Sequence, residues 1–224
     1  MRKHSLKETE TLGWGSKTAV YDPQKCQILD SYTIGPKVLD LGCATALYTK
    51  YISNKFQAYG MDWNLPLLKT ISRSRVKSII NADALKLPLK DKSINTVVMF
   101  DILEHVDESQ IIKEVARVAK NRIIITVPRT TDKELKQNFL LFGHHQDTTH
   151  LRTYTQTSAQ KMLAKHRLKP IIIKPIHPIS TIGLLYDVLD SPVLVKKIFR
   201  KLTLNLLHPK TFYSNILIVA DLKS

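Results

Sequence analysis

The stretch Lys37-Val-Leu-Asp-Leu-Gly-Cys-Ala-Thr-Ala-Leu-Tyr-Thr49 contains a short apolar run that ends at a glycine. The run from Val38 to Leu41 lies between Gly35-Pro36 and Gly42, which is typical of a buried strand in a parallel sheet. After Gly42, apolar residues recur at helical spacing, so the pattern predicts a strand that turns sharply into a helix. Such a turn directs backbone N–H groups and the positive end of a helix dipole toward a ligand above the sheet.

A second predicted strand, Ala58-Tyr-Gly-Met-Asp62, ends in a carboxylate twenty residues after Gly42. A carboxylate at the tip of the second strand can accept hydrogen bonds from both hydroxyls of a ribose, which predicts a nucleoside site. Dinucleotide enzymes need the three glycines of G-x-G-x-x-G so that a pyrophosphate can approach the backbone. Here the run is Gly42-Cys-Ala-Thr-Ala-Leu, which argues against a pyrophosphate and allows a ligand without phosphates.

The composition predicts one folded domain over residues 1–224, because 43% hydrophobic and 24% charged residues are ordinary for a globular chain. No apolar stretch is long enough to span a bilayer, and the first residues lack the apolar core of a signal peptide. Cys26 and Cys43 are the only cysteines. Reduced thiols are the simplest account of them, so the sequence predicts a cytoplasmic protein.

The net charge of +15 is the unusual bulk property, and it is uneven. Residues 151–224 hold 12 Lys and Arg against 3 acidic residues, a balance of +9, while residues 1–150 hold 22 against 16, a balance of +6. This bias indicates an anionic partner, which could be a nucleic acid, a lipid headgroup or a phosphorylated metabolite. Solubility alone would also explain it.

A basic amphipathic insert is predicted at about residues 180–208 from its leucine spacing and flanking charges. The apolar positions are Leu194, Ile198, Leu202 and Leu206, and the basic ones are Lys196, Lys197, Arg200 and Lys201. The pattern fits an interfacial helix, which would place the protein peripherally at a membrane, or a lid over a greasy substrate. An ordinary helix packed on the sheet is the alternative.

From Pro36 onward the pattern alternates between strand and helix, which predicts an α/β protein with a parallel sheet covered on both faces. Ligands of such sheets bind beyond the carboxyl ends of the strands. Residues 1–33 are predicted as a polar lead-in or lid, 34–128 as the cofactor half and 129–224 as the substrate half. The predicted strands are 38–41, 57–61, 76–80, 96–101, 122–127, 168–174 and 212–221, and the helices are 45–53, 65–72, 108–119 and 158–166.

Four segments match, in order and spacing, those of the class I S-adenosylmethionine-dependent methyltransferases. They are Val38-Leu-Asp-Leu-Gly-Cys-Ala-Thr-Ala, Gly60-Met-Asp-Trp63, Asn81-Ala-Asp-Ala-Leu-Lys-Leu-Pro88 and Phe100-Asp-Ile-Leu-Glu-His-Val106. The sequence most resembles the type 11 branch, which contains ubiquinone and menaquinone methylases. The resemblance implies a Rossmann-like, doubly wound, seven-stranded and mostly parallel sheet, with an antiparallel C-terminal strand inserted between strands five and six.

The resemblance also implies S-adenosylmethionine as the cofactor. Asp62 would accept the ribose hydroxyls, Asp83 would bond the adenine amine, and Asp40 with the backbone at Gly42 would hold the methionine portion. The other implied cofactor contacts are Cys43, Ala44, Trp63, Ala84, Phe100 and Asp101. Asp83 could instead cap a turn, and Asp40 could orient the loop. The family usually carries glycine where this chain has Ala44 and Ala46, and alanine disfavours a positive φ.

Three histidines are predicted to act in catalysis, because histidine is the side chain best able to take a proton near neutral pH. His105 follows the fourth strand, and His145 and His150 lie in the segment after strand five, which faces the active site in the family. A plain hydrogen bond to a loop is the alternative for His105. No metal is predicted, because the spacing of the histidines between residues 144 and 150 matches no standard zinc pattern.

Four further side chains are predicted to contact the acceptor. Arg152 could pair with a carboxylate or phosphate of the acceptor, and Tyr154 lies in the same segment. Trp14 and Tyr21 could close over the site from the N-terminal side, although packing against the sheet edge is an alternative for Trp14.

The sequence therefore predicts an S-adenosylmethionine-dependent methyltransferase that acts on a small-molecule or lipid-like acceptor by direct displacement. Methylation of RNA, above all tRNA, is one alternative. The charge favours it, but the N-methylating motif Asn/Asp-Pro-Pro-Tyr and an appended RNA-binding domain are missing. A non-catalytic nucleoside-binding module is the other alternative, and only Ala44 and Ala46 hint at it.

Overall fold

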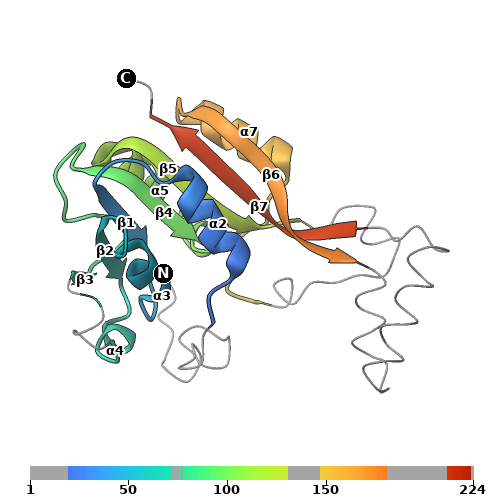
Figure 1. Ribbon diagram of the computed structural model, residues 1–224. Coiled ribbons are helices and arrows are strands. Elements are labelled where there is room, and N and C mark those ends of the chain that lie inside the picture. The colour runs from blue at the N-terminus through green and yellow to red at the C-terminus, as the bar shows by residue number, and fades with distance from the viewer. Residues whose placement is uncertain (1–19, 72–75, 77, 131–146, 181–210, 223–224) are drawn as a thin grey trace, which may run out of the picture.

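The computed structural model describes residues 20–71, 76, 78–130, 147–180 and 211–222. Within these ranges a single sheet has the strand order β3-β2-β1-β4-β5-β7-β6 (Figure 1). Its strands are β1 Lys37–Leu41, β2 Gln57–Asp62, β3 Ile79–Asn81, β4 Ile94–Phe100, β5 Ala119–Pro128, β6 Lys169–Ser180 and β7 Thr211–Asp221. Strands β1 to β5 run parallel, and β7 pairs antiparallel with both β5 and β6. The predicted fold, including the inserted C-terminal strand, is confirmed.

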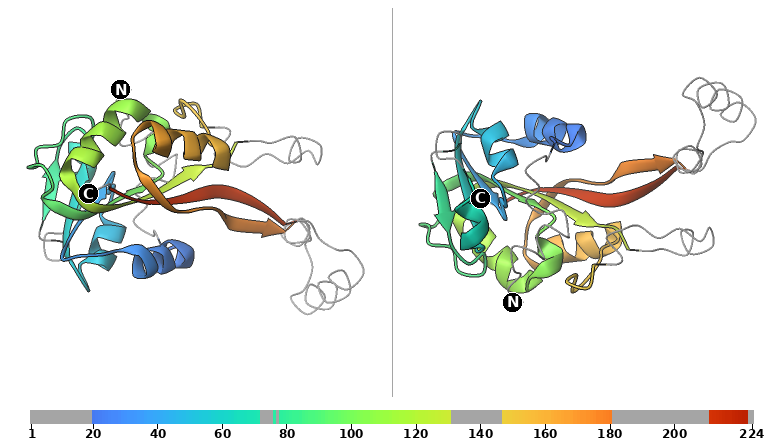
Figure 2. Two further views of the ribbon diagram at one scale, coloured as in Figure 1. Left: turned by 90° about the horizontal axis from the view of Figure 1, so that it is seen from above. Right: turned by 90° about the horizontal axis from the view of Figure 1, so that it is seen from below.

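Helices cover both faces of the sheet, as expected for a doubly wound fold. Viewed along the sheet, α2 and α3 lie on one face, and α5 and α7 lie on the other (Figure 2). The described helices are α2 Pro23–Tyr32, α3 Leu47–Ile52, α4 Leu65–Leu68, α5 Glu108–Val118 and α7 Gln156–Lys165, with a short 3₁₀ helix η1 at Leu103–His105.

Helix α2 lies within the segment 1–33 that the sequence analysis treated as a polar lead-in, and no helix was predicted there. Asp22 caps the helix by accepting hydrogen bonds from the backbone N–H groups of Gln24 and Lys25. Pro23 occupies the first turn, where its missing N–H costs nothing. The dipeptide Asp22-Pro23 is a known helix-start signal and could have revealed α2 from the sequence.

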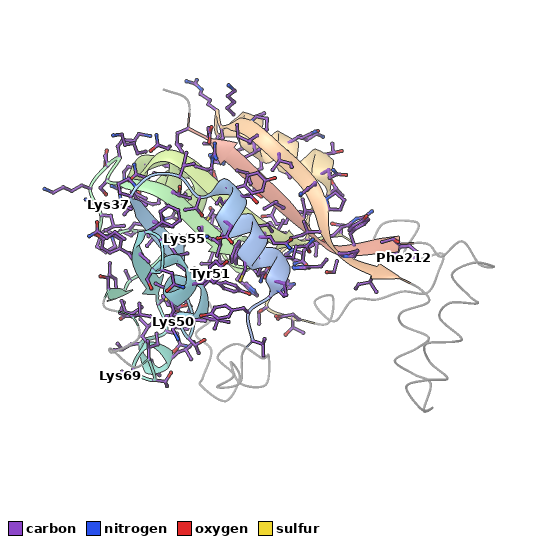
Figure 3. The ribbon with its side chains drawn as sticks, viewed as in Figure 1. Lys37, Lys50, Tyr51, Lys55, Lys69 and Phe212 are labelled. Atoms are coloured by element: carbon purple, nitrogen blue, oxygen red, sulfur yellow. The ribbon has the colours of Figure 1, made fainter. Side chains whose placement is uncertain are left out.

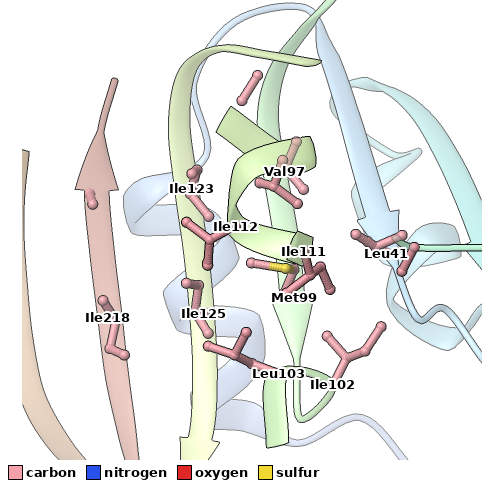
Figure 4. Close-up of a cluster of buried hydrophobic side chains, with 14 of the residues drawn as sticks. Leu41, Val97, Met99, Ile102, Leu103, Ile111, Ile112, Ile123, Ile125 and Ile218 are labelled. Atoms are coloured by element: carbon pink, nitrogen blue, oxygen red, sulfur yellow. The ribbon is translucent and has the colours of Figure 1, made fainter. Parts of the chain in front are cut away.

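Helix α5 packs on β4 and β5 through a cluster of buried hydrophobic side chains (Figure 4). Ile123 and Ile125 of β5 are fully buried and belong to one hydrophobic cluster with Ile111 and Ile112 of α5. Ile124 points to the opposite face and is equally buried in a second cluster. A strand that is buried on both faces needs a continuous apolar run, which explains the isoleucine triplet.

Several predictions fall on residues that the structure does not describe. The basic insert lies outside the described residues, except where it begins at the end of β6. Trp14, His145 and the end of the predicted helix 65–72 also lie outside them. Among the described helices, none combines the length and the hydropathy that a transmembrane span requires.

Candidate active site

The loops that follow β1, β2 and β4 bring Gly42, Asp62 and Asp101 to one edge of the sheet. These three strands are parallel neighbours, with Asp40 opposite Gly60 and Val98 in the register. Their carboxyl ends therefore meet, which is where ligands of open α/β sheets bind. The loop after β1 is tied to β2, because the backbone N–H groups of Gly42 and Cys43 both donate to the carbonyl of Met61.

Asp62 presents its carboxylate beside this loop. Oδ2 accepts a hydrogen bond from the Ala44 N–H at 3.0 Å, and Oδ1 accepts one from the Asn64 N–H at 2.8 Å. Each carboxylate oxygen has a second lone pair. Asp62 can therefore be held by the backbone and still accept two hydroxyl donors, which is what binding of a ribose requires.

The loop after β1 takes left-handed backbone angles at three positions. Gly42 has φ 77°, and a Cβ there would lie 2.9 Å from Cδ1 of Ile102. Ala44 and Ala46 have φ 47° and 60°, in the region that favours glycine. Both alanines therefore carry backbone strain at the positions where the sequence analysis expected glycine.

Replacing Ala44 by glycine is expected to stabilise the protein slightly. Relief of the left-handed strain gains about 1–2 kcal/mol, and the extra freedom of the unfolded glycine costs about 0.4–1 kcal/mol. A net rise in the free energy of unfolding of up to about 1.6 kcal/mol should appear in urea denaturation. A loss of stability in Ala44→Gly would contradict the strained loop geometry.

Asp40 is buried beneath the loop, and its Oδ2 accepts a 2.6 Å hydrogen bond from the Thr49 hydroxyl of α3. Burial raises the pKa of Asp40 to about 6, although the Thr49 hydrogen bond opposes this. The bond to α3 supports the alternative in which Asp40 orients the loop.

Asp40 is expected to make the stability depend on pH. The folded carboxyl keeps its proton up to about pH 6, whereas the ordinary pKa is 3.8. Its contribution to stability is therefore fully present below the ordinary pKa and is lost as the pH rises through the folded value. Asp40→Asn should raise the free energy of unfolding by about 1–2 kcal/mol at pH 8, less than the full linkage effect because the buried amide needs a new partner.

The measurement is urea denaturation of wild type and Asp40→Asn at pH 4 and pH 8. Little difference is expected at pH 4, where both side chains are neutral. Asp91→Asn is the matched control, because its side chain is 72% exposed. Equal stabilisation by Asp40→Asn at both pH values would contradict the raised pKa.

The predicted adenine side of the site lies at the ends of β2 and β3. Asp83 is exposed, and its Oδ1 accepts the Leu85 N–H, so it makes the turn contact that was the structural alternative. Ala84 is buried in the core, and Trp63 is half-buried. Asn81, which the sequence analysis missed, donates its side-chain amide to the carbonyls of Asp62 and Trp63 and so fixes the tip of β2.

Asp101, at the end of β4, is paired with Lys25, another residue that the sequence analysis missed. Lys25 Nζ lies 2.5 Å from Asp101 Oδ2, and Oδ1 accepts from the Thr126 hydroxyl and the Asn215 amide. Burial opposes the charge of each partner, but the ion pair prevails and raises the pKa of Lys25 while lowering that of Asp101. Asp101 has φ 54°, a strained angle that these contacts hold in place.

Aromatic side chains line the approach to Lys25. Its Nζ lies 5.6 Å from the centre of the Tyr48 ring and 5.3 Å from that of Phe100, and the two rings meet edge to face. Tyr21 packs against Tyr48 and Tyr51 of α3, with centroid distances of 6.4 and 5.6 Å. Tyr51 stands on this face beside Lys50 and Lys55 (Figure 3). The predicted acceptor contact Tyr21 therefore belongs to an aromatic group that joins the N-terminal segment to α3.

The structure brings together two of the three predicted catalytic histidines. The rings of His105 and His150 lie 4.6 Å apart, edge to face. The Thr149 hydroxyl lies 3.0 Å from Nδ1 of His105 and donates to Oδ1 of Asp147 at 2.6 Å. Nε2 of His150 lies 3.5 Å from Oδ2 of Asp147. One carboxylate therefore orients both rings, directly for His150 and through Thr149 for His105.

Arg152 and Tyr154, the predicted acceptor contacts of this segment, both bond to neighbouring parts of the chain. The Arg152 guanidinium donates to the carbonyls of Leu103 and Val106, on either side of η1. Tyr154 is buried in the core, and its hydroxyl donates to Glu108. Both bonds of Arg152 use Nη1, and the bond of Tyr154 uses its hydroxyl.

Glu104, between Asp101 and His105, is a buried carboxyl that the sequence analysis did not single out. Its side chain is 1% exposed, and within the described part of the chain Oε2 has no hydrogen-bond partner. Burial, followed by the charge of Asp101, raises its pKa well above the ordinary value. A buried charged group without a partner is costly, so such a carboxyl is rare outside functional sites.

A family model described as "Methyltransferase domain" matches residues 39–125. The protein named "Probable tRNA methyltransferase 9B" from Bos taurus is 31% identical over 100 residues, covering 43% of this chain and 22% of the relative. "Uncharacterized protein MJ0638" from Methanocaldococcus jannaschii is 30% identical over 110 residues, covering 47% of this chain and 48% of the relative. The chain thus spans about a fifth and about half of the lengths of these relatives.

Solved structures share the fold over most of the chain. A putative methyltransferase from Bacillus halodurans C-125 matches with a TM-score of 0.63 and 14% identity, covering 91% of this chain and 99% of the other. An S-adenosylmethionine-dependent methyltransferase from Archaeoglobus fulgidus matches with a TM-score of 0.63 and 18% identity, covering 88% and 91%. At these identities the likeness shows the fold.

Proposed function

We propose that this chain moves a methyl group to a small-molecule or lipid-like acceptor. The premise is that it belongs to the class I S-adenosylmethionine-dependent methyltransferases of the type 11 family. The observation that carries the proposal is the carboxylate of Asp62, which is bonded to the loop after β1 and keeps lone pairs for two ribose hydroxyls. Gly42 packs so closely against Ile102, which follows β4, that a Cβ at this position would lie 2.9 Å from its Cδ1.

S-adenosylmethionine supplies an electrophilic methyl on a sulfonium, which a lone pair of the acceptor displaces to leave a neutral thioether. In-line displacement needs alignment above all. Asp62 and the loop at Gly42 would fix the nucleoside and methionine portions, while Asp101 lies at the tip of the next strand, where the resemblance places the sulfur. His105 and His150 would act on the acceptor, whose proton must leave before or during attack.

The burial of the acceptor-side groups supports a small acceptor. The side chains of Asp147 and His150 are 11% and 10% exposed, so these two groups are largely covered. A covered polar site suits a ligand that enters it and is largely enclosed. From the two cysteines, taken as reduced thiols, we also propose a cytoplasmic location. The net charge of +15 would suit peripheral contact with an anionic membrane.

Methylation of tRNA is the second candidate. It is supported by the printed name of the tRNA methyltransferase relatives, which are 30–31% identical over 100 residues, and by the same net charge. Binding of RNA through Lys and Arg would weaken steeply with added salt.

The experiment is the transfer of a radioactive methyl group from S-adenosylmethionine to separate fractions of a cell extract. Label in the metabolite or lipid fraction, but not in tRNA, is expected. Label in tRNA alone would favour the second candidate. Binding of S-adenosylhomocysteine without transfer to any fraction would favour the non-catalytic nucleoside-binding module.

A further inference from the structure

Glu104, His105 and His150 form a group of potential metal ligands on the acceptor side of the site. One ligand atom from each residue lies within 4.8 Å of the ligand atoms of the other two. Glu104 and His105 come from η1, and His150 comes from the segment that precedes α7. The prediction of no metal rested on the spacing of neighbouring histidines, whereas this group forms only when distant segments meet.

Glu104 provides an independent reason to expect a cation. Its carboxyl is buried, and Oε2 lacks a hydrogen-bond partner among the described residues. The Glu104 carbonyl accepts from the Leu151 N–H, which anchors the turn next to His150. A buried carboxylate oxygen without a partner is destabilising, and a bound cation would satisfy it.

The hydrogen bonds of the two histidines prepare their rings for metal binding. The Thr149 hydroxyl uses its proton on Asp147, so its oxygen accepts from Nδ1–H of His105, and the ring's lone pair is on Nε2. Asp147 faces Nε2 of His150 at 3.5 Å and so orients that ring as well. Metal-binding histidines characteristically donate their other N–H to such a carboxylate or to a group that it orients.

We propose that Glu104, His105 and His150 bind one divalent transition-metal ion of the zinc class and that its open coordination position takes an oxygen of the acceptor. Two imidazoles and one carboxylate are a ligand set of catalytic zinc sites, which keep a fourth position open. Mg²⁺ and Ca²⁺ prefer oxygen ligands only. Metal–ligand bonds of about 2.0–2.2 Å imply that the three side chains move closer together on binding.

The role of the ion rests on the proposed function. A metal-bound hydroxyl of the acceptor loses its proton to solvent more easily, because the cation lowers its pKa. The resulting oxygen forms the bond to the methyl carbon, the carbon–sulfur bond breaks, and its electron pair stays on sulfur. Asp147 is a positioning residue in this scheme, since it acts through the histidines.

The test is calorimetric titration of the full-length, metal-stripped chain with Zn²⁺ and, separately, with Mg²⁺. We expect one Zn²⁺ per chain and no binding of Mg²⁺. Glu104→Gln and His150→Asn should each weaken Zn²⁺ binding at least tenfold, and Asp147→Asn by about 10–100-fold. His166→Asn is the matched control, because His166 lies at the end of α7. It should leave Zn²⁺ binding unchanged.

Wild type that binds no Zn²⁺, or binds it equally after His150→Asn, would overturn the site. Thermal unfolding without metal shows whether each variant is folded, and the visible absorption of Co²⁺ bound to wild type gives a second readout that needs no variant. Binding of S-adenosylhomocysteine is measured on the same metal-free samples. If it persists where Zn²⁺ does not bind, the metal inference alone is refuted and the proposed function stands.

Discussion

Replacing Asp62 by alanine is expected to weaken binding of S-adenosylhomocysteine by about 1.5–3 kcal/mol, the range for hydrogen bonds to a charged group. The variant loses the two ribose contacts, and it also frees the N–H groups of Ala44 and Asn64 that the carboxylate holds. The expected fall in affinity is about 10–150-fold, because each 1.4 kcal/mol corresponds to a factor of ten.

Isothermal titration calorimetry of wild type and Asp62→Ala provides the measurement. Asp91→Ala removes an exposed carboxylate that pairs with Arg117, and it should leave the affinity unchanged. Thermal unfolding of the ligand-free variants shows whether Asp62→Ala has loosened the loop after β1 or has only lost its contacts to the ribose. If Asp62→Ala binds as tightly as wild type, the ribose assignment is wrong.

Replacing His105 by asparagine is expected to lower kcat by about 10²–10⁴-fold, the range for loss of a group that handles a proton of the substrate. The histidine lies beside His150 and is oriented through Thr149, four residues beyond Asp101. The affinity for S-adenosylhomocysteine should remain within about threefold of wild type, well under 1 kcal/mol.

The assay follows formation of S-adenosylhomocysteine with the acceptor found by label transfer, and His166→Asn serves as the control. A fall in affinity equal to the fall in kcat would place His105 in the cofactor site instead. If kcat and affinity are both unchanged, His105 only makes the hydrogen bond to a loop that was its alternative role. The fall in kcat is expected whether His105 handles a proton or binds a metal ion. The Zn²⁺ titration distinguishes these two roles.

The alternation of strands and helices could be predicted because its signals are local and repeated. The apolar run before Gly42 and the isoleucines at 123–125 report burial on both faces, and the alternation with helical segments predicts parallel pairing. Asp62 could be assigned because the end of a second strand has a fixed place relative to the first. The antiparallel position of β7 came from the family resemblance.

The acceptor side could not be predicted in the same way, since its partners are distant in sequence. Lys25 reaches Asp101 from a helix whose start signal was overlooked, and no local pattern reports that pairing. Arg152 looked like an anion-binding residue because charge is visible in a sequence, whereas the carbonyls that its guanidinium contacts are not. The burial of Glu104 follows from packing of η1 beneath the segment around Leu151, which only the tertiary structure reveals.

The most direct measurement is a crystal structure of the protein soaked with S-adenosylhomocysteine. We expect the nucleoside above the carboxyl ends of β1 and β2, with both ribose hydroxyls donating to the carboxylate of Asp62. An empty site at saturating ligand, or a bound nucleoside whose ribose does not contact Asp62, would contradict the account.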